Sequence, residues 1–220
     1  MAAVKADPAK RTYAGRTQAE RTAERRAALI TAAFELIARD GWSQLRIERI
    51  CQLAALNKRY FYESFADLDE VIVAVLDQLA QSAIVVTLAA MEQPGELTDV
   101  VHAGIHALVH HLVDDPRRAR VLFGESSPSE AAARHRTTAI QQIVIAASAQ
   151  GRSVHHLQDT RDPHLDLAGA LLVGGTRQAV LEWIDGLLHD DIEQFIDDLA
   201  ALWLAVGDDA AERTRSRSGE

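Results

Sequence analysis

Residues 41–72 read GWSQLRIERICQLAALNKRYFYESFADLDEVI, which predicts a short helix, a tight turn and a second short helix. The second helix begins with Asn57, Lys58, Arg59 and Tyr60. A helix that opens with cationic and hydrogen-bonding side chains can enter the major groove of DNA, where arginine and lysine contact base edges and phosphates. No other stretch of this chain indicates one kind of partner so specifically.

The composition indicates an all-α protein. Hydrophobic residues make up 48% of the 220 residues, enough for a sizeable core, whereas 12 glycines and 5 prolines are few for a chain built from many turns. Cys51 is the only cysteine, so no internal disulfide can form, which fits a reducing cytoplasm. We find neither the apolar core of a signal peptide nor a run expected to span a bilayer. The sequence thus predicts a soluble cytoplasmic protein with no membrane partner.

The charge is divided unevenly along the chain. The net charge is -9, yet residues 1–65 hold 12 Lys+Arg against 7 Asp+Glu, whereas the remaining 155 residues hold 11 against 25. The cationic first part attracts phosphates and the anionic remainder repels them, which would orient the protein on a duplex. Arginines spread over solvated helices would give the same counts, so charge alone does not decide the partner.

Capping residues mark the predicted helix boundaries in the first third of the chain. Thr17 and Glu20 have the spacing of a capping box at the start of a long helix, and Gly41 is a candidate stop for it. Ser43 is a candidate cap for the second helix and Asn57 for the third. All three helices are therefore expected between residues 17 and 66.

The rest of the chain is also expected to be helical. Asp67 and Glu70 again have capping-box spacing and begin a long fourth helix, while Phe61 and Phe65 are expected to lie in the core rather than to stack on bases. Further helices are predicted near residues 97–113, 116–123, 129–149, 164–187 and 190–206.

Residues 28–76 resemble the DNA-binding domain of the TetR (tetracycline-repressor-type) family. The matching pieces are Ala32-Ala33 through Leu36, Gly41-Trp42, Ile47 to Ile50, Leu56-Asn57-Lys58 and Phe61-Tyr62 through Phe65. Members of that family have an N-terminal three-helix domain with a helix-turn-helix and a larger helical domain that binds an effector and dimerises. The implied organisation is a disordered basic arm at 1–16, a DNA-binding domain at 17–66, an effector-binding and dimerisation domain at 67–207, and a disordered tail at 208–220.

The resemblance and the side-chain chemistry assign the same DNA contacts. The predicted DNA-binding residues are Arg46, Asn57, Lys58, Arg59, Tyr60 and Tyr62. Arg59 could bond bidentately to guanine O6 and N7, whereas Lys58 and Tyr62 would mainly set position on the phosphates. The chain departs from the family's pattern at Ala55, a turn position where glycine is usual, so the turn is expected to be costlier or differently shaped. It also departs at Leu45, Ser64 and Leu68.

Two apolar stripes near the C-terminus predict a subunit interface. The resemblance implies that the last two helices form a four-helix bundle with those of a second copy, and paired half-sites in DNA require such two-fold symmetry. The predicted interface residues are Leu172, Gly175, Ala179, Trp183, Phe195, Leu199 and Leu202. The alternative is that both stripes are buried within one monomer.

Histidines recur every fourth residue on one predicted helix face at His102, His106 and His110, with His111 alongside. Surface or ordinary packing, the lining of an effector cavity and metal binding are all open interpretations, because a zinc site needs three or four ligands. We predict no metal and no cofactor. The family implies a cavity between helices, and the candidate lining residues are His102, His106, Val109, Ile140, Val144, Leu171 and Arg177, the last as an anion partner.

The sequence therefore predicts a homodimeric regulator of transcription that binds a double-stranded DNA operator. It is expected to act as a repressor that a small-molecule effector releases. We expect no catalytic residues, since the chain contains no HExxH, GxSxG or P-loop motif. The alternatives are a helical metal-dependent hydrolase that uses the His102/His106/His110 face, and a helical adaptor without DNA binding.

Overall fold

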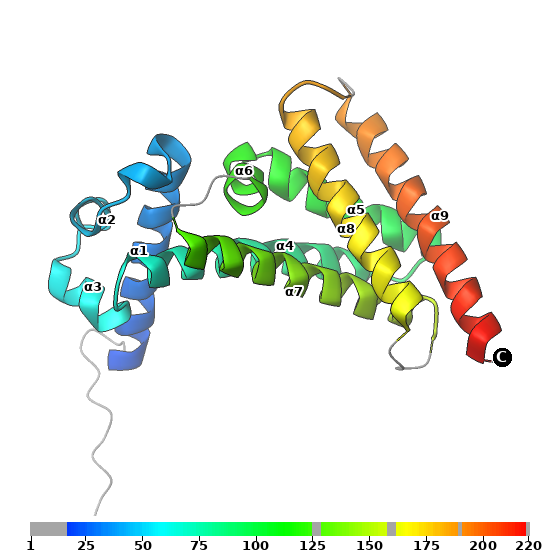
Figure 1. Cartoon of the computed structure of the whole chain (residues 1–220), viewed down its shortest axis with the longest axis horizontal. Helices are drawn as coiled ribbons and strands as arrows, with labels where there is room; N and C mark the ends of the chain where they lie inside the picture. Colours follow the sequence, from blue (N-terminus) through cyan, green and yellow to red (C-terminus); the bar gives the residue numbers. More distant parts are fainter. Residues whose placement is uncertain (1–16, 125–128, 158–161, 189–190, 219–220) are drawn as a thin grey trace, which may run out of the picture. The chain divides into compact units, whose positions relative to one another are not determined.

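The computed structural model describes residues 17–124, 129–157, 162–188 and 191–218, so the predicted basic arm at 1–16 lies outside the described residues. The described residues form α-helices and one 3-10 helix without any strand (Figure 1), which confirms the all-α prediction. The chain divides into two compact units, Met1–Ile72 and Val73–Glu220. This division falls within the fourth helix, a few residues after the boundary predicted at residue 66.

The N-terminal unit is built on α1 (Gln18–Asp40), which packs against η1 (Trp42–Gln44), α2 (Ile47–Leu53) and α3 (Lys58–Ser64). Its start is the predicted capping box: the Thr17 hydroxyl accepts from the Glu20 N–H, and the Glu20 carboxylate accepts from the Thr17 N–H. It ends at Gly41, whose φ of 79° is readily adopted by glycine. One face of α1 fills the core with Leu29, Ala32, Ala33, Leu36 and Ile37.

The start of α2 differs from the prediction. Ser43 lies in η1 and does not cap α2; Arg46 occupies the N-cap position and makes no side-chain capping bond. The reason is that Leu45 is buried and the chain turns through one 3-10 turn before α2 begins.

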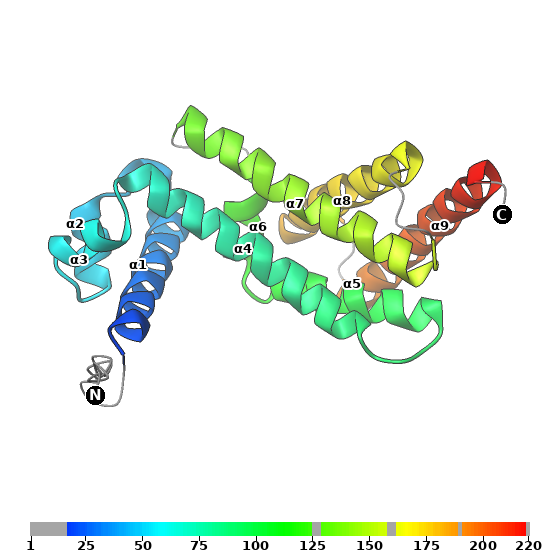
Figure 2. The same ribbon diagram turned by 90° about the horizontal axis from the view of Figure 1, so that it is seen from below.

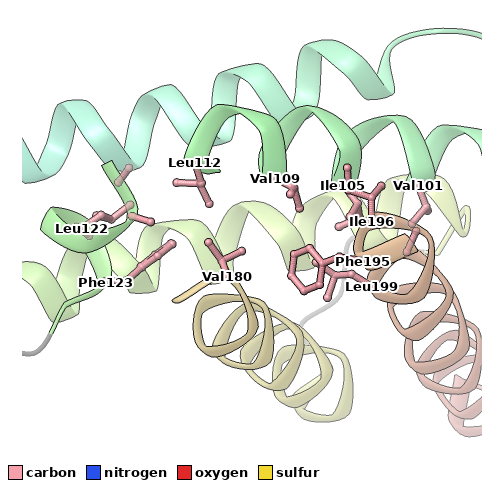
Figure 3. Close-up of a cluster of buried hydrophobic side chains, with 14 residues drawn as sticks. Val101, Ile105, Val109, Leu112, Leu122, Phe123, Val180, Phe195, Ile196 and Leu199 are labelled. Carbon is pink, nitrogen blue, oxygen red and sulfur yellow. The ribbon is translucent and has the colours of Figure 1, made fainter. Parts of the chain in front are cut away.

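The C-terminal unit begins within α4 (Leu68–Met91) and contains α5 (Leu97–Val113), α6 (Pro116–Phe123), α7 (Glu130–Val154), α8 (Pro163–Ile184) and α9 (Ile192–Ser218). In this unit α7 packs against α8, and α5 and α8 both pack against α9. Both views of the molecule show α8 and α9 side by side (Figures 1 and 2). Their shared core with α5 includes Val109, Val180 and Ile196 (Figure 3).

The end of α9 is a second difference from the prediction. The segment from Asp208, expected to be disordered, continues α9 to Ser218. Ala210 and Ala211 are buried, and Arg213 donates to the Asp209 carboxylate at 2.8 Å, so this segment has both a packed face and a stabilising pair one turn apart.

The apolar character of α4 also departs from expectation. Its most apolar 18 residues have a mean hydropathy of 1.9, and by length and composition this is one helix among the described residues that could cross a membrane. Core helices of globular proteins can be equally long and apolar. In this structure 39% of the stretch is buried. The residues Ala83, Thr87 and Met91 line a cavity inside the unit, which accounts for the apolar surface of its second half.

Candidate nucleic-acid interface and ligand cavity

The turn between α2 and α3 is a Schellman motif with alanine at its left-handed position. The Ala55 N–H donates to the Gln52 carbonyl at 3.2 Å, and the Leu56 N–H donates to the Cys51 carbonyl at 2.9 Å. Ala55 has a φ of 53°, the conformation that glycine adopts at least cost. The chain therefore keeps the turn that the helix-turn-helix needs and holds Ala55 in a strained backbone conformation.

The start of α3 is fixed by one cap and one buried face. The Asn57 carboxamide oxygen accepts from the Tyr60 N–H at 3.2 Å, which confirms the predicted cap. Phe61 and Phe65 are buried, with ring centroids 5.7 Å apart, as predicted. Because these rings hold one face of α3 in the core, its opposite face and its first turn are left to solvent.

The two cations of the first turn are accessible and are held by carboxylates. The Lys58 side chain is 55% exposed and pairs with Glu48 of α2, while the Arg59 side chain is 83% exposed and its Nε donates to Glu63 Oε1 at 2.9 Å. The hydrogen bond to Glu48 raises the pKa of Lys58 and lowers the pKa of Glu48. Exposed pairs of this kind are weak, so phosphates can displace the carboxylates at small cost.

The other predicted DNA-binding residues differ in their exposure and partners. Tyr62 is exposed, whereas Tyr60 is half-buried with the Arg25 guanidinium 4.5 Å from the centre of its ring. Arg46 is exposed, and its Nη1 donates to the carbonyls of Ser43 and Leu45 at 2.8 and 2.7 Å. Glu48, Glu63 and Arg25 were not predicted from the sequence, and they contact the predicted residues Lys58, Arg59 and Tyr60.

The C-terminal unit contains a cavity of about 140 Å³ lined by residues of α4, α5, α7, α8 and α9 and by Phe123 at the end of α6. Most of its wall is apolar, for example Ile84, Leu108, Ile143 and Leu165. An apolar cavity of this kind binds small molecules through hydrophobic contact, with few polar groups to orient them. The surrounding helices therefore form a candidate ligand site.

Polar groups occupy only a few points of the cavity wall. The Ser148 hydroxyl is buried without a hydrogen-bond partner among the described residues, and it lies where a side chain on Gly169 would have to stand. The Trp203 indole N–H donates to the Thr176 hydroxyl at 2.8 Å. A ligand group that reached Ser148 would satisfy its hydroxyl.

Arginine supplies the charge beside this cavity. Arg177 lines it and donates from Nε and Nη2 to the Phe123 carbonyl at 3.1 and 2.8 Å. Arg136 of α7 is buried, and the pKa of its guanidinium is lowered by burial and by the positive charge of Arg177. The Arg177 guanidinium in this largely apolar wall favours an anionic ligand group.

The lining predicted from sequence coincides with this cavity only at Arg177. His102, His106, Val109, Ile140, Val144 and Leu171 do not belong to the cavity wall. Val109 is fully buried in the core and Leu171 is 63% exposed. The physical reason is helix phase: α5 turns Val101, Gly104, Ile105 and Leu108 to the cavity, and the histidine face lies on its other side.

The histidines of α5 contact α9 and α4 instead. His102 Nε2 lies 2.8 Å from Asp197 Oδ1, and His110 Nε2 lies 3.7 Å from Glu193 Oε1. His111 points elsewhere, with its Nε2 3.0 Å from the Ser82 hydroxyl, and burial lowers its pKa. The prediction that His102 and His106 line the cavity is therefore wrong. The histidine face of α5 lies beside α9 instead.

The predicted interface residues separate into two groups. Phe195 and Leu199 are buried in the core with α5 residues (Figure 3), Trp183 and Ala179 pack against that core, and Leu172 lines the cavity. These residues therefore pack within one monomer, as the alternative interpretation of the two stripes expected. The reason is that α5 and α8 pack against α9 and cover its apolar stripe. Gly175 and Leu202 remain exposed.

Comparison with known proteins shows likeness at the level of structure. No protein-family model matches the chain, and no curated protein matches its sequence. A transcriptional regulator from Pseudomonas aeruginosa superposes with a TM-score of 0.70 at 17% identity, covering 88% of this chain and 95% of its own. A TetR-family regulator from Marinobacter aquaeolei gives 0.59 at 18% identity, covering 86% and 98%. FadR from Bacillus subtilis, solved with stearoyl-CoA, gives 0.61 at 16% identity, covering 84% and 97%.

These likenesses extend over most of both chains and are therefore not confined to the helix-turn-helix. They agree with the resemblance found in residues 28–76 and with the division into an N-terminal three-helix unit and a larger helical unit. The chain has the fold of the TetR-family transcriptional regulators.

Proposed function

We propose that this protein is a homodimeric DNA-binding regulator of transcription, acting as a repressor that a small molecule releases from its operator. The observation that carries the proposal is the first turn of α3. Lys58 and Arg59 stand there in solvent, on a helix whose opposite face is anchored by Phe61 and Phe65. A short helix presented in this way is suited to the major groove.

The side chains of this turn have distinct roles in the proposal. Arg59 reads a guanine through O6 and N7, which supplies discrimination between sequences. Lys58, Tyr62 and Arg46 contact phosphates and set the register on the duplex. Glu48 and Glu63 hold the two cations in the free protein and give way to phosphates on DNA.

The effector we propose is an apolar molecule that carries an anionic group. The wall of the cavity is almost entirely apolar, which favours a hydrocarbon-rich ligand, and Arg177, which is bonded to the Phe123 carbonyl, favours a negative charge at that end. A chain of similar fold binds stearoyl-CoA, a ligand with both features. An acyl compound therefore matches the chemistry of this cavity.

The subunit interface we propose uses the exposed apolar face of α8 and α9. Leu167, Leu171 and Leu202 are exposed on these helices. Gly174 and Gly175 are exposed beside them, and a side chain built on either would meet nothing within 4 Å, so they leave room for the backbone of a second copy. This face replaces the interior residues predicted from sequence.

The link between ligand and DNA is α4. Its first residues belong to the N-terminal unit, and its second half lines the cavity at Ile84, Leu88 and Met91. A ligand that moves this helix changes the separation of the two α3 helices in the dimer. Because the spacing of major grooves is fixed at about 34–36 Å, such a shift weakens binding.

The test is selection of duplexes from a random pool by the full-length protein, compared with the Arg59→Ala variant. We expect the wild-type chain to enrich a near-palindromic sequence, and the variant to lose preference at one position of each half-site. Failure of the wild-type protein to enrich any sequence over the starting pool contradicts the proposal.

A further inference from the structure

A second group of chemically active side chains lies outside the cavity and the DNA-binding turn. One ring nitrogen each of His106 and His110, on α5, and a carboxylate oxygen of Glu193, at the start of α9, lie within 4.8 Å of one another. We propose that His106, His110 and Glu193 form a binding site for a divalent transition-metal ion of the Zn²⁺ class.

The orientation of His110 is the strongest support for this site. Its Nδ1 lies 3.3 Å from Asp114 Oδ1, one turn further along α5, which favours the tautomer with the proton on Nδ1 and the lone pair on Nε2. Metal-bound histidines are commonly held by such a carboxylate. The His110 Nε2 is buried and has no hydrogen-bond partner among the described residues, and it faces Glu193 at 3.7 Å. An acceptor nitrogen in that state would gain from a cation.

The three ligands also have suitable chemistry and spacing. The rings of His106 and His110 have centroids 4.5 Å apart, as expected for residues one turn apart on a helix. Tetrahedral zinc with bonds of about 2.0–2.2 Å needs its ligand atoms about 3.3–3.6 Å apart. The Glu193 side chain is 61% exposed, which leaves it room to rotate toward this spacing. Two imidazoles and one carboxylate favour zinc over calcium or magnesium.

The backbone that carries these ligands is held by the core beneath them. Val109 and Ile105 of α5 pack with Phe195 and Ile196 of α9 in one buried cluster (Figure 3). The site thus joins two helices whose contact already exists, and little rearrangement opposes binding. A bound ion ties α5 to α9 and leaves a fourth position for water.

His102 provides a matched control on the same helix face. It lies one turn before His106, and its Nε2 is already bonded to Asp197 Oδ1 at 2.8 Å, so it is outside the proposed ligand set. Removing it takes away one histidine and leaves the three ligands unchanged.

The experiment is titration of untagged, full-length protein with Zn²⁺, followed by calorimetry and by thermal unfolding. We expect one ion per chain and, at free zinc about 100 times the dissociation constant, a rise in Tm of about 5–10 °C. His106→Ala, His110→Ala and Glu193→Gln should each weaken binding at least about tenfold, and Asp114→Asn about 10- to 100-fold. His102→Ala should bind as the wild type does.

Two results would overturn the site. The first is wild-type protein that binds no zinc with a stoichiometry of one. The second is an equal loss in His102→Ala and in His106→Ala, which would mean diffuse binding by surface histidines. The circular dichroism of each variant without zinc separates loss of the site from loss of the fold, and Glu193→Gln tests the site without removing any core contact.

Discussion

At the scale of single residues, the most informative position is Ala55. The sequence shows alanine where a turn of this type favours glycine, and the structure places it at a φ of 53° within a Schellman motif. The surrounding helices compel this conformation, since α2 and α3 both pack against α1. A substitution that suits the left-handed conformation can therefore relieve the backbone strain at this turn.

Ala55→Gly is predicted to stabilise the N-terminal unit by about 0.5–1 kcal/mol, because relief of the left-handed strain exceeds the extra freedom of glycine in the unfolded chain. Hydrogen exchange of the amides in residues 29–37 should slow by about two- to fivefold, as that free energy implies. Ala54→Gly should instead destabilise the unit, because Ala54 has a φ of -75° and is not strained. Equal effects of the two substitutions would contradict the account of the turn.

Single residues also show what a sequence can and cannot predict. The caps at Thr17 and Asn57 depend on neighbours within three residues, so local spacing was sufficient to find them. The roles of Val109 and Phe195 depend on which helix packs against which, and periodicity alone does not contain that information. The same stripe of apolar side chains therefore predicted an interface where the structure has a core.

At the scale of elements, one carboxylate connects the end of α1 to α2 beside their apolar contact. Asp40, the last residue of α1, accepts from Arg39 Nε at 2.9 Å and from Arg49 Nη2 of α2 at 2.6 Å. These hydrogen bonds, that of Arg39 first, lower the pKa of Asp40 from 3.8 to about 2. The charged form is therefore favoured by folding.

Because the folded-state pKa lies below the unfolded value, the stability contributed by Asp40 is complete above pH 3.8 and is lost as the pH falls towards 2. Asp40→Asn should lower the free energy of unfolding at pH 7, and its difference from wild type should shrink over that acid range. Urea unfolding at a series of pH values measures this difference. A gap that stays constant down to the lowest pH would show that the ionisation of Asp40 contributes nothing.

The helices around the cavity include one glycine at which the cavity can be filled. Gly151 of α7 lines the cavity, and a side chain built on it meets nothing within 4 Å. Gly151→Leu should fill the space, whereas Gly151→Ala should leave most of it open. With anilinonaphthalene sulfonate as an apolar anionic probe, we expect strong loss of bound fluorescence for Gly151→Leu alone. Unchanged fluorescence in that variant would place the probe, and the proposed effector site, elsewhere.

At the scale of the whole molecule, the exposed face of α8 and α9 sets the proposed assembly. Leu171 and Leu202 are 63% and 60% exposed, so charges there cost the monomer little but oppose a dimer strongly. Leu171→Glu and Leu202→Glu are predicted to give monomers in sedimentation velocity at concentrations where wild type is dimeric. Leu187→Glu, at an exposed leucine after the end of α8, should remain dimeric. Dimers that persist in both α8 and α9 variants would assign the interface to another surface.

The uneven charge along the chain acts at this same scale. The sequence predicted a cationic N-terminal part and an anionic remainder, and a dimer would carry two copies of each. What the sequence could not supply was the pairing of Lys58 with Glu48, because this pair depends on how α2 packs against α3. The pair of Arg59 with Glu63 lies within α3 at i, i+4 spacing, which helical periodicity alone predicts. The cations of the proposed interface are thus partly screened until DNA displaces their partners.

The most direct test of DNA recognition by α3 is the affinity for the selected duplex, measured against salt for the wild type, Lys58→Ala and Arg59→Ala. Lys58→Ala should weaken binding to all duplexes by the same factor. It should also reduce the slope of log affinity against log salt by about two for a dimer. Arg59→Ala should lose about 1–3 kcal/mol of discrimination in each half-site. If Arg59→Ala keeps the full sequence preference and Lys58→Ala keeps the full salt slope, α3 is not the element that reads DNA.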